Sequence, residues 1–109
     1  AAADAGKLGI GVDSNQNHLH PGHVLTSMTK GVDVAVITAF KDGSEGGTWT
    51  SGVQVLGLKE NGVGWALDEN NKALITPEMQ AAADKAKAGI VDGTIKVHDY
   101  MSDDNCPAG

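Results

Sequence analysis

Two oppositely charged side chains, Asp13 and Lys30, are placed where they could hold a small polar ligand. Asp13 directly follows the short apolar stretch Ile10-Gly11-Val12, and a carboxylate there can accept two hydrogen bonds from a diol. Lys30 follows a second apolar segment, 17 positions later (30 − 13), and its ammonium could pair with Asp13 and donate to the same hydroxyl. Two alternatives stay open: Asp13 could stabilise a turn through its own backbone, and Lys30 could be a solvated surface lysine.

Three histidines lie close together between these two charges, in the pattern His18-x-His20-x-x-His23. Neutral imidazoles at this density can bind a metal ion. No cysteine or carboxylate completes a known metalloenzyme spacing, and His-Glu-x-x-His is absent. A metal site at these histidines and a plain polar surface are therefore both possible interpretations.

The remaining candidates for chemistry are weak. Cys106, the single cysteine, lies in an acidic stretch with Asp103 and Asp104, whereas a reactive thiol needs an electropositive setting. The sequence lacks a dinucleotide fingerprint, a phosphate-binding loop and a Gly-x-Ser-x-Gly nucleophile turn. We therefore expect no catalytic residue and no cofactor.

Composition limits the class of protein. The chain has 109 residues, of which 40% are hydrophobic and 15 are glycine, with a net charge of −6. This is typical of one α/β domain rich in turns. The chain has 8 lysines and 14 acidic residues. This acidic balance argues against a nucleic-acid-binding protein, since phosphate contacts need a basic patch.

Hydrophobic periodicity and turn residues predict the elements that position these side chains. A helical stripe of Val32, Val36, Ala39 and Phe40 predicts a helix over 31–42 that Gly43 ends, followed by a glycine-rich turn over 42–50. Thr76 as the N-cap and Pro77 at the first position predict a second helix that continues to Gly93. Strands are expected over residues 8–12, 23–28, 52–58, 63–67 and 94–97.

This order of elements predicts an α/β fold with a mostly parallel sheet. Ligands bind at the carboxyl ends of the strands in such sheets, which is where Asp13 is expected. The residues before the first strand read as the end of a helix that Gly6 stops. We therefore expect the chain to be part of a longer protein.

Four segments, in this order and spacing, resemble the C-terminal third of the basic membrane lipoprotein family. These are substrate-binding proteins of bacterial ABC transporters, and the purine-nucleoside-binding lipoproteins are the best-known members. The similarity covers residues 1–97 and leaves 98–109 as a polar, loose tail. The segments are Ile10-Gly11-Val12-Asp13-Ser14-Asn15-Gln16, residues 24–36 (Val-Leu-Thr-Ser-Met-Thr-Lys-Gly-Val-Asp-Val-Ala-Val), residues 56–64 (Leu-Gly-Leu-Lys-Glu-Asn-Gly-Val-Gly), and the Thr76-Pro77-Glu78 helix leading to Gly93-Thr94-Ile95-Lys96-Val97.

The resemblance implies a fragment of a two-lobed type I periplasmic-binding-protein fold, with segments of both lobes. It implies a protein without enzymatic activity that binds a nucleoside or similar ribosyl ligand and delivers it to a membrane permease. Asp13 and Lys30 match the family's Asp and Lys that hydrogen-bond ribose hydroxyls. The three histidines are outside the family pattern, and Trp65 stands where a smaller apolar residue is usual.

The resemblance also implies a place in the cell and a missing partner. Family members are periplasmic or at the cell surface, anchored to lipid through a cysteine that would lie upstream. The N-terminal portion of the same protein would carry the sheet on which the helix over 31–42 packs, so we expect that helix to have an exposed apolar face. Two alternatives remain: an effector-sensing domain of a regulator with the same fold, and a small His-dependent metal-binding protein.

Overall fold

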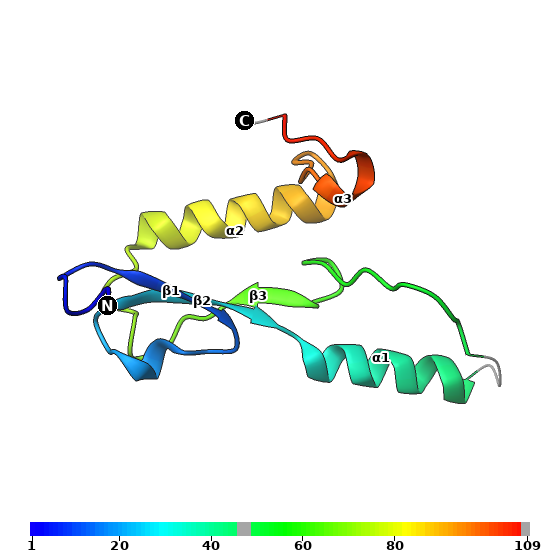
Figure 1. The fold of residues 1–109 in the computed structure, drawn as a ribbon, viewed down its shortest axis with the longest axis horizontal. Coiled ribbons are helices and arrows are strands. Elements are labelled where there is room, and N and C mark those ends of the chain that lie inside the picture. Colours follow the sequence, from blue (N-terminus) through cyan, green and yellow to red (C-terminus); the bar gives the residue numbers. More distant parts are fainter. Residues whose placement is uncertain (46–48, 108–109) are drawn as a thin grey trace.

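The computed structural model describes residues 1–45 and 49–107, so residues 46–48 of the turn expected over 42–50 lie outside it, as do 108–109 of the tail. Three strands form one sheet in the order β1 (Gly9–Asp13), β2 (Val24–Lys30) and β3 (Val63–Trp65). A short 3-10 helix, η1 (Asn17–Leu19), lies in the loop between β1 and β2. The chain is thus an α/β unit in which β2 is central (Figure 1).

The sheet is mixed, with one parallel and one antiparallel pair. β1 and β2 run parallel, with Asp13 opposite Thr29. β3 runs antiparallel to β2, with Lys30 opposite Val63. A turn at Asn61-Gly62 brings the chain back beside the end of β2, where the Gly31 N–H donates to the Gly62 carbonyl at 2.8 Å. This return sets the antiparallel direction of β3.

Two longer helices follow the predicted pattern, with one boundary misplaced. α1 spans Val32–Glu45 and continues through Gly43, which was expected to end it. A glycine inside a helix costs only about 1 kcal/mol, so it does not by itself stop one. α2 spans Pro77–Asp92, with Thr76 accepting a hydrogen bond from the Met79 N–H at 3.2 Å and Gly93 in the left-handed region as its C-cap.

The strands predicted over 52–58 and 94–97 are absent from the described part of the chain, and both predictions were wrong. Val53 and Val55 are 95% and 85% exposed, and no strand of the described chain pairs with their backbone. After α2, the Thr94 hydroxyl and the Ile95 N–H both donate to the Gly89 carbonyl. The end of α2 thus holds the backbone that was expected to form a strand.

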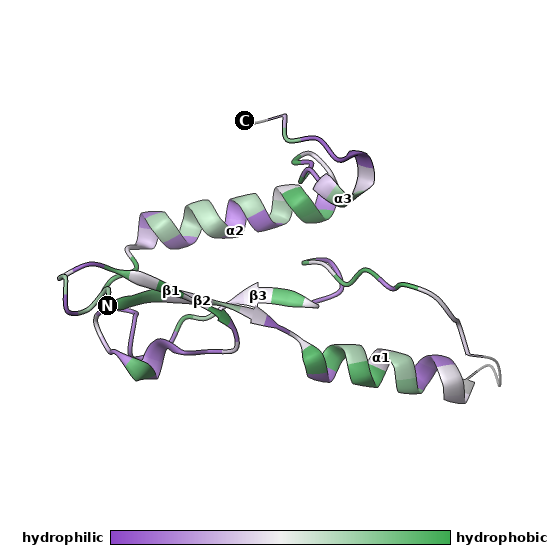
Figure 2. Cartoon of the chain, in the orientation of Figure 1, coloured by the Kyte–Doolittle hydropathy of each residue, from purple (hydrophilic) through white to green (hydrophobic). Residues whose placement is uncertain are grey.

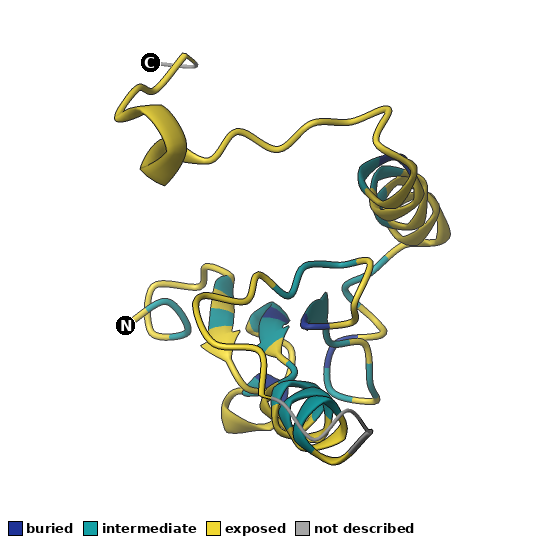
Figure 3. Ribbon diagram, turned by 90° about the vertical axis from the view of Figure 1, so that its right-hand side faces the viewer, coloured by how far each residue is buried: buried dark blue, intermediate teal, exposed yellow. Residues whose placement is uncertain are grey.

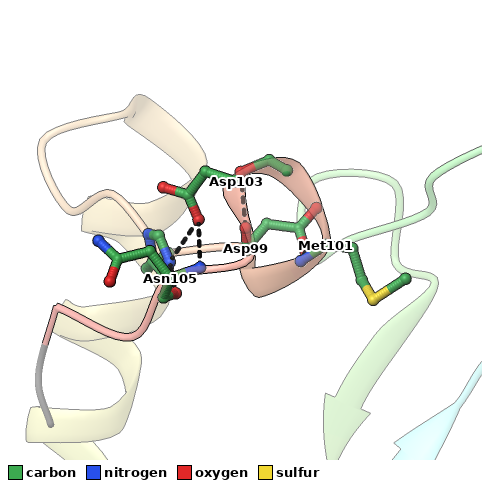
Figure 4. Close-up of polar contacts among 6 residues, drawn as sticks. Asp99, Met101, Asp103 and Asn105 are labelled. Atoms are coloured by element: carbon green, nitrogen blue, oxygen red, sulfur yellow. Dashed lines mark hydrogen bonds and ion pairs between the residues drawn. The ribbon is translucent and has the colours of Figure 1, made fainter.

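The tail is more ordered than expected, because it contains a single helical turn, α3 (Tyr100–Asp103). Asp99 caps this turn by accepting from the Met101 N–H, and Asp103 accepts from the Asn105 N–H (Figure 4). His98 Nε2 lies 3.3 Å from Asp103 Oδ1. All described residues of the tail are exposed (Figure 3).

The described chain buries no large hydrophobic side chain. Its only fully buried side chains are those of Asn17, Ser27 and Asn71. The radius of gyration is 17.1 Å, against about 13 Å for a compact domain of this length. α1 extends beyond the end of β2, whereas α2 runs alongside the strands, and neither helix packs closely against the sheet (Figure 1).

The apolar face predicted for the first helix is exposed. Val32, Val36 and Phe40 are 67%, 63% and 70% exposed, while Ala39 is half-buried. Much of α1 is hydrophobic, as the green ribbon in Figure 2 shows, and the helix extends from the end of β2 beyond the sheet (Figure 1). No helix among the described residues has both the length and the apolar character needed to cross a bilayer.

Candidate ligand-binding site

Asp13 and Lys30 form an ion pair at the carboxyl ends of neighbouring parallel strands. Asp13 is the last residue of β1 and Lys30 the last of β2, so the parallel pairing brings both to the same edge of the sheet. Lys30 Nζ lies 2.6 Å from Asp13 Oδ1. The two side chains are 56% and 65% exposed, which leaves oxygen and nitrogen atoms open to a ligand.

The backbone of Asp13 has a left-handed conformation, with φ of 77°. Few residues other than glycine adopt this region, although aspartate is one of those that tolerate it. Surrounding contacts must hold such a conformation, and strained residues of this kind cluster at ligand sites. The conformation turns the chain sharply at the point where the carboxylate leaves the sheet.

The loop after Asp13 is fastened to β1 and β2 by polar side chains. Gln16 donates from its side chain to the Val12 carbonyl at 2.7 Å, and from its backbone N–H to Ser27 Oγ at 3.0 Å. The Ser27 hydroxyl donates in turn to Asn17 Oδ1 at 2.8 Å. Gly11 makes room for this arrangement, since a Cβ there would lie 2.6 Å from Ser27 Oγ.

Asp68, in the turn after β3, binds the same loop from the other side. Its carboxylate accepts from the side-chain amides of Asn15 at 2.7 Å and Asn17 at 3.1 Å. It also accepts from the backbone N–H of Asn70. These hydrogen bonds, that from Asn15 foremost, hold the pKa of Asp68 below its ordinary 3.8.

Asn71 ties that turn to the central strand. Its buried side-chain amide donates to the carbonyls of Leu25 and Ala66, each at 2.9 Å, and its Oδ1 accepts from the Asp68 N–H. We did not predict this role of Asn71 from the sequence. An aspartate and an asparagine three positions apart are typical of side chains that bond their own turn, and nothing in that pattern indicates the strand they reach.

An open hollow lies beside Lys30. It has a volume of about 360 Å³, and its walls come from the end of β2, the start of α1, the turn before β3, and Lys87 of α2. Lys30 therefore lines a concave, partly polar surface, and Asp13 is not among the residues that line it.

The structure does not bring the three histidines together into one cluster. No group of three or more His, Cys, Asp or Glu side chains that could hold a metal ion occurs among residues 1–45 and 49–107. His18 lies in η1, while His20 and His23 flank the turn that leads into β2, where the His23 N–H donates to the His20 carbonyl at 2.9 Å. Cys106 is free and exposed in the tail.

Comparison with known proteins identifies the family. Residues 1–100 match the family model described as "ABC transporter substrate-binding protein PnrA-like". The chain belongs to this family. Residues of the match include both members of the ion pair and the whole polar network behind Asp13.

Individual relatives agree with this assignment. Basic membrane protein D of Borreliella burgdorferi strain JD1 is 39% identical over 98 residues, which are 88% of this chain and 28% of that protein. An uncharacterized lipoprotein of Pyrococcus abyssi is 48% identical over 62 residues, which are 56% of this chain and 15% of that protein. The chain thus spans less than a third of the length of these curated relatives.

A solved structure shares the fold. An ABC transporter system solute-binding protein from Aeropyrum pernix K1 superimposes with a TM-score of 0.61 at 29% sequence identity. The match covers 94% of this chain and 37% of that one. The α/β arrangement described above is therefore part of a solute-binding-protein fold.

Proposed function

We propose that residues 1–97 form the C-terminal part of a two-lobed solute-binding protein that binds a nucleoside or a similar ribosyl compound between its lobes. The observation that supports this most is the exposed Asp13–Lys30 ion pair at the carboxyl ends of two parallel strands. In this proposal the protein delivers its ligand to the membrane permease of an ABC transporter and catalyses no reaction.

The pair has the chemistry that a vicinal diol requires. The Asp13 carboxylate has two oxygens and can accept from two adjacent hydroxyls, while the Lys30 ammonium donates to a hydroxyl oxygen. Hydrogen bonds to charged groups are stronger than neutral ones. Closure of a second lobe over the pair would remove water and strengthen both interactions.

The exposed apolar surface supports the two-lobe arrangement. Val32, Val36 and Phe40 on α1 are each more than 60% exposed, which is costly for a folded protein unless another surface covers them. We propose that the covering surface is the N-terminal portion of the same protein. Each wholly buried Val or Phe contributes about 1.5–3 kcal/mol.

The names of two relatives support a location outside the cytoplasm. Proteins of Pyrococcus abyssi and Pyrococcus horikoshii that match this chain are named lipoproteins. We propose that this protein is likewise outside the cytoplasm, in the periplasm or at the cell surface, and anchored to lipid through a cysteine upstream of these residues.

Calorimetric titration of the full-length protein with a purine nucleoside, inosine, tests the binding role. Asp13→Asn keeps the size of the side chain but removes its charge, so we expect a loss of about 1–3 kcal/mol, or about 5–150-fold in Kd. Lys30→Met should weaken binding to a similar extent.

Matched controls come from α2, where Asp84 and Lys85 are exposed. Asp84→Asn and Lys85→Met should leave the Kd unchanged within about twofold, since they alter the same charges away from the pair. Equal affinity of the wild type and both site variants would remove Asp13 and Lys30 from the binding site.

A further inference from the structure

The left-handed backbone of Asp13 needs contacts that hold it, and β1 alone supplies few. Asp13 is the last residue of β1, so the chain beyond it has left the sheet. The residues that follow reach the rest of the molecule through Asn15, Gln16 and Asn17. Lys30 contacts the Asp13 carboxylate directly, whereas the contacts of these three side chains fix the backbone from which that carboxylate projects.

The side chains of Asn15 and Asn17 both donate hydrogen bonds to the carboxylate of Asp68. Asp68 Oδ2 accepts from Asn15 Nδ2 and from Asn17 Nδ2, across sequence separations of 53 and 51 residues. Asn17 is fully buried, and its other side-chain atom, Oδ1, accepts from the buried Ser27 hydroxyl. Asp68 thus orients both amides, and through Asn17 it orients the serine that accepts from the Gln16 backbone.

We propose that Asp68 is a positioning residue for the ligand: it holds the loop over residues 14–17 so that Asp13 keeps its left-handed backbone and presents its carboxylate to the sugar. The ligand part of this inference rests on the proposed function. Asp68 itself does not touch the ligand in this proposal, and it acts only through Asn15 and Asn17.

The turn that carries Asp68 is fixed independently of the loop. Asn71 donates to carbonyls of Leu25 and Ala66, and the Thr26 hydroxyl also donates to the Ala66 carbonyl. Asp68 accepts as well from the Asn70 N–H within its own turn. Its carboxylate therefore lies on a rigid support at the central strand, which a positioning residue needs. The lowered pKa of Asp68 agrees with a carboxylate whose charged form these donors stabilise.

The test compares Asp68→Asn with Asp92→Asn in the full-length protein, by calorimetric titration with inosine. Asp92 is a matched control, because its carboxylate also accepts from a backbone N–H and a side chain, both of Thr94, and its pKa is also lowered. We expect Asp68→Asn to raise the Kd at least about tenfold and Asp92→Asn to leave it within about twofold. An unchanged Kd for Asp68→Asn overturns the proposal.

A double-variant cycle separates positioning from a general loss of structure. If Asp68 acts through Asp13, the variant with both Asp13→Asn and Asp68→Asn should bind no more weakly than Asp13→Asn alone. Additive losses would instead mean that Asp68 acts on binding by another route, and would overturn the proposal.

Amide hydrogen exchange provides a measurement that needs no ligand. The Gln16 N–H donates to Ser27 Oγ, and the Asn17 N–H donates to Asn15 Oδ1. Both amides should therefore exchange faster in Asp68→Asn and at an unchanged rate in Asp92→Asn. If Asp13→Asn leaves inosine binding intact, the proposed function fails, and faster exchange still supports the hold of Asp68 on the loop. Unchanged exchange at both amides overturns it.

Discussion

Asp13 and Lys30 contribute little to stability where they stand. Both side chains are more than half exposed, and exposed ion pairs contribute about 0–1 kcal/mol. The polar groups behind them are different, because Asn17, Ser27 and Asn71 are buried and fully hydrogen-bonded. The residues proposed to bind and the residues that hold them are therefore separate sets. Substitutions at the ion pair should change affinity with little effect on stability, whereas substitutions in the polar network should change both.

Gly11 is the residue at which crowding behind the site is most direct. A Cβ at this position would lie 2.6 Å from Ser27 Oγ and 3.1 Å from Gln16 Cβ. We expect Gly11→Ala to destabilise the full-length protein by about 1–3 kcal/mol, since overpacking forces the surrounding atoms to move. Urea unfolding measures this.

Gly64 in β3 is the control for Gly11, because a Cβ there would meet only Thr29 Oγ1, at 3.4 Å. Gly64→Ala should cost clearly less than Gly11→Ala. Equal costs for the two variants would show that the packing of Ser27 against Gly11 is unimportant.

Asp68 should make the stability of the folded protein depend on pH. Its hydrogen bonds lower its folded pKa below the ordinary 3.8, so its contribution is complete above that value and is lost as the pH falls through the folded pKa. The destabilisation caused by Asp68→Asn should therefore be smaller at about pH 3 than at about pH 6 in urea unfolding. The same difference at both pH values would contradict a lowered pKa.

The sequence indicated the two charged residues of the candidate site, but it did not indicate the residues that hold them in place. The position of Asp13 at a strand end and the short distance to Lys30 in the fold were predictable, because parallel strands end at a common edge. The role of Asp68 was not, since its partners Asn15 and Asn17 are more than 50 positions away. The sequence alone does not distinguish an asparagine that bonds a distant residue from one that is solvated in a loop.

At the scale of elements, helix-capping residues predicted the ends of α2 correctly, because the capping of a helix end depends only on neighbouring residues. The Thr76-Pro77 start and the Gly93 end of α2 depend only on neighbouring residues, and both predictions are confirmed. The strands expected over 52–58 and 94–97 needed partners from elsewhere, and apolar alternation cannot say whether partners exist. Val53 and Val55, which the alternation placed in a half-buried strand, are instead exposed.

The N-cap of α2 gives an element-scale prediction. Thr76 accepts from the Met79 N–H, one of the N–H groups that a helix start otherwise leaves without a partner. Thr76→Ala should therefore destabilise the full-length protein by about 1 kcal/mol, whereas Thr76→Ser should restore most of the loss because serine also caps. Thermal unfolding of the three proteins decides this, and a serine variant as unstable as the alanine variant would exclude the capping role.

The whole molecule lacks what a self-standing domain needs. No large hydrophobic side chain is buried in the described chain, and its radius of gyration of 17.1 Å exceeds the roughly 13 Å of a compact domain. Hydrophobic burial is the main favourable contribution to folding. The polar network around Ser27 can orient a site, but it cannot replace a core.

A polypeptide of these 109 residues should therefore not fold cooperatively by itself. We expect a shallow thermal transition by circular dichroism, and a sharper one when the N-terminal portion of the full-length protein is added, since that portion would cover α1. Phe40→Asp should abolish this gain, because it places a charge in the contact surface. A sharp transition for the isolated 109 residues would contradict the two-lobe account.

A crystal structure of the full-length protein with inosine is the most direct test of the central claim. We expect the ribose hydroxyls to lie within hydrogen-bond distance, about 2.5–3.2 Å, of the Asp13 carboxylate and the Lys30 ammonium, with the second lobe closed over them. Inosine bound elsewhere, with the Asp13–Lys30 pair still facing solvent, would contradict it.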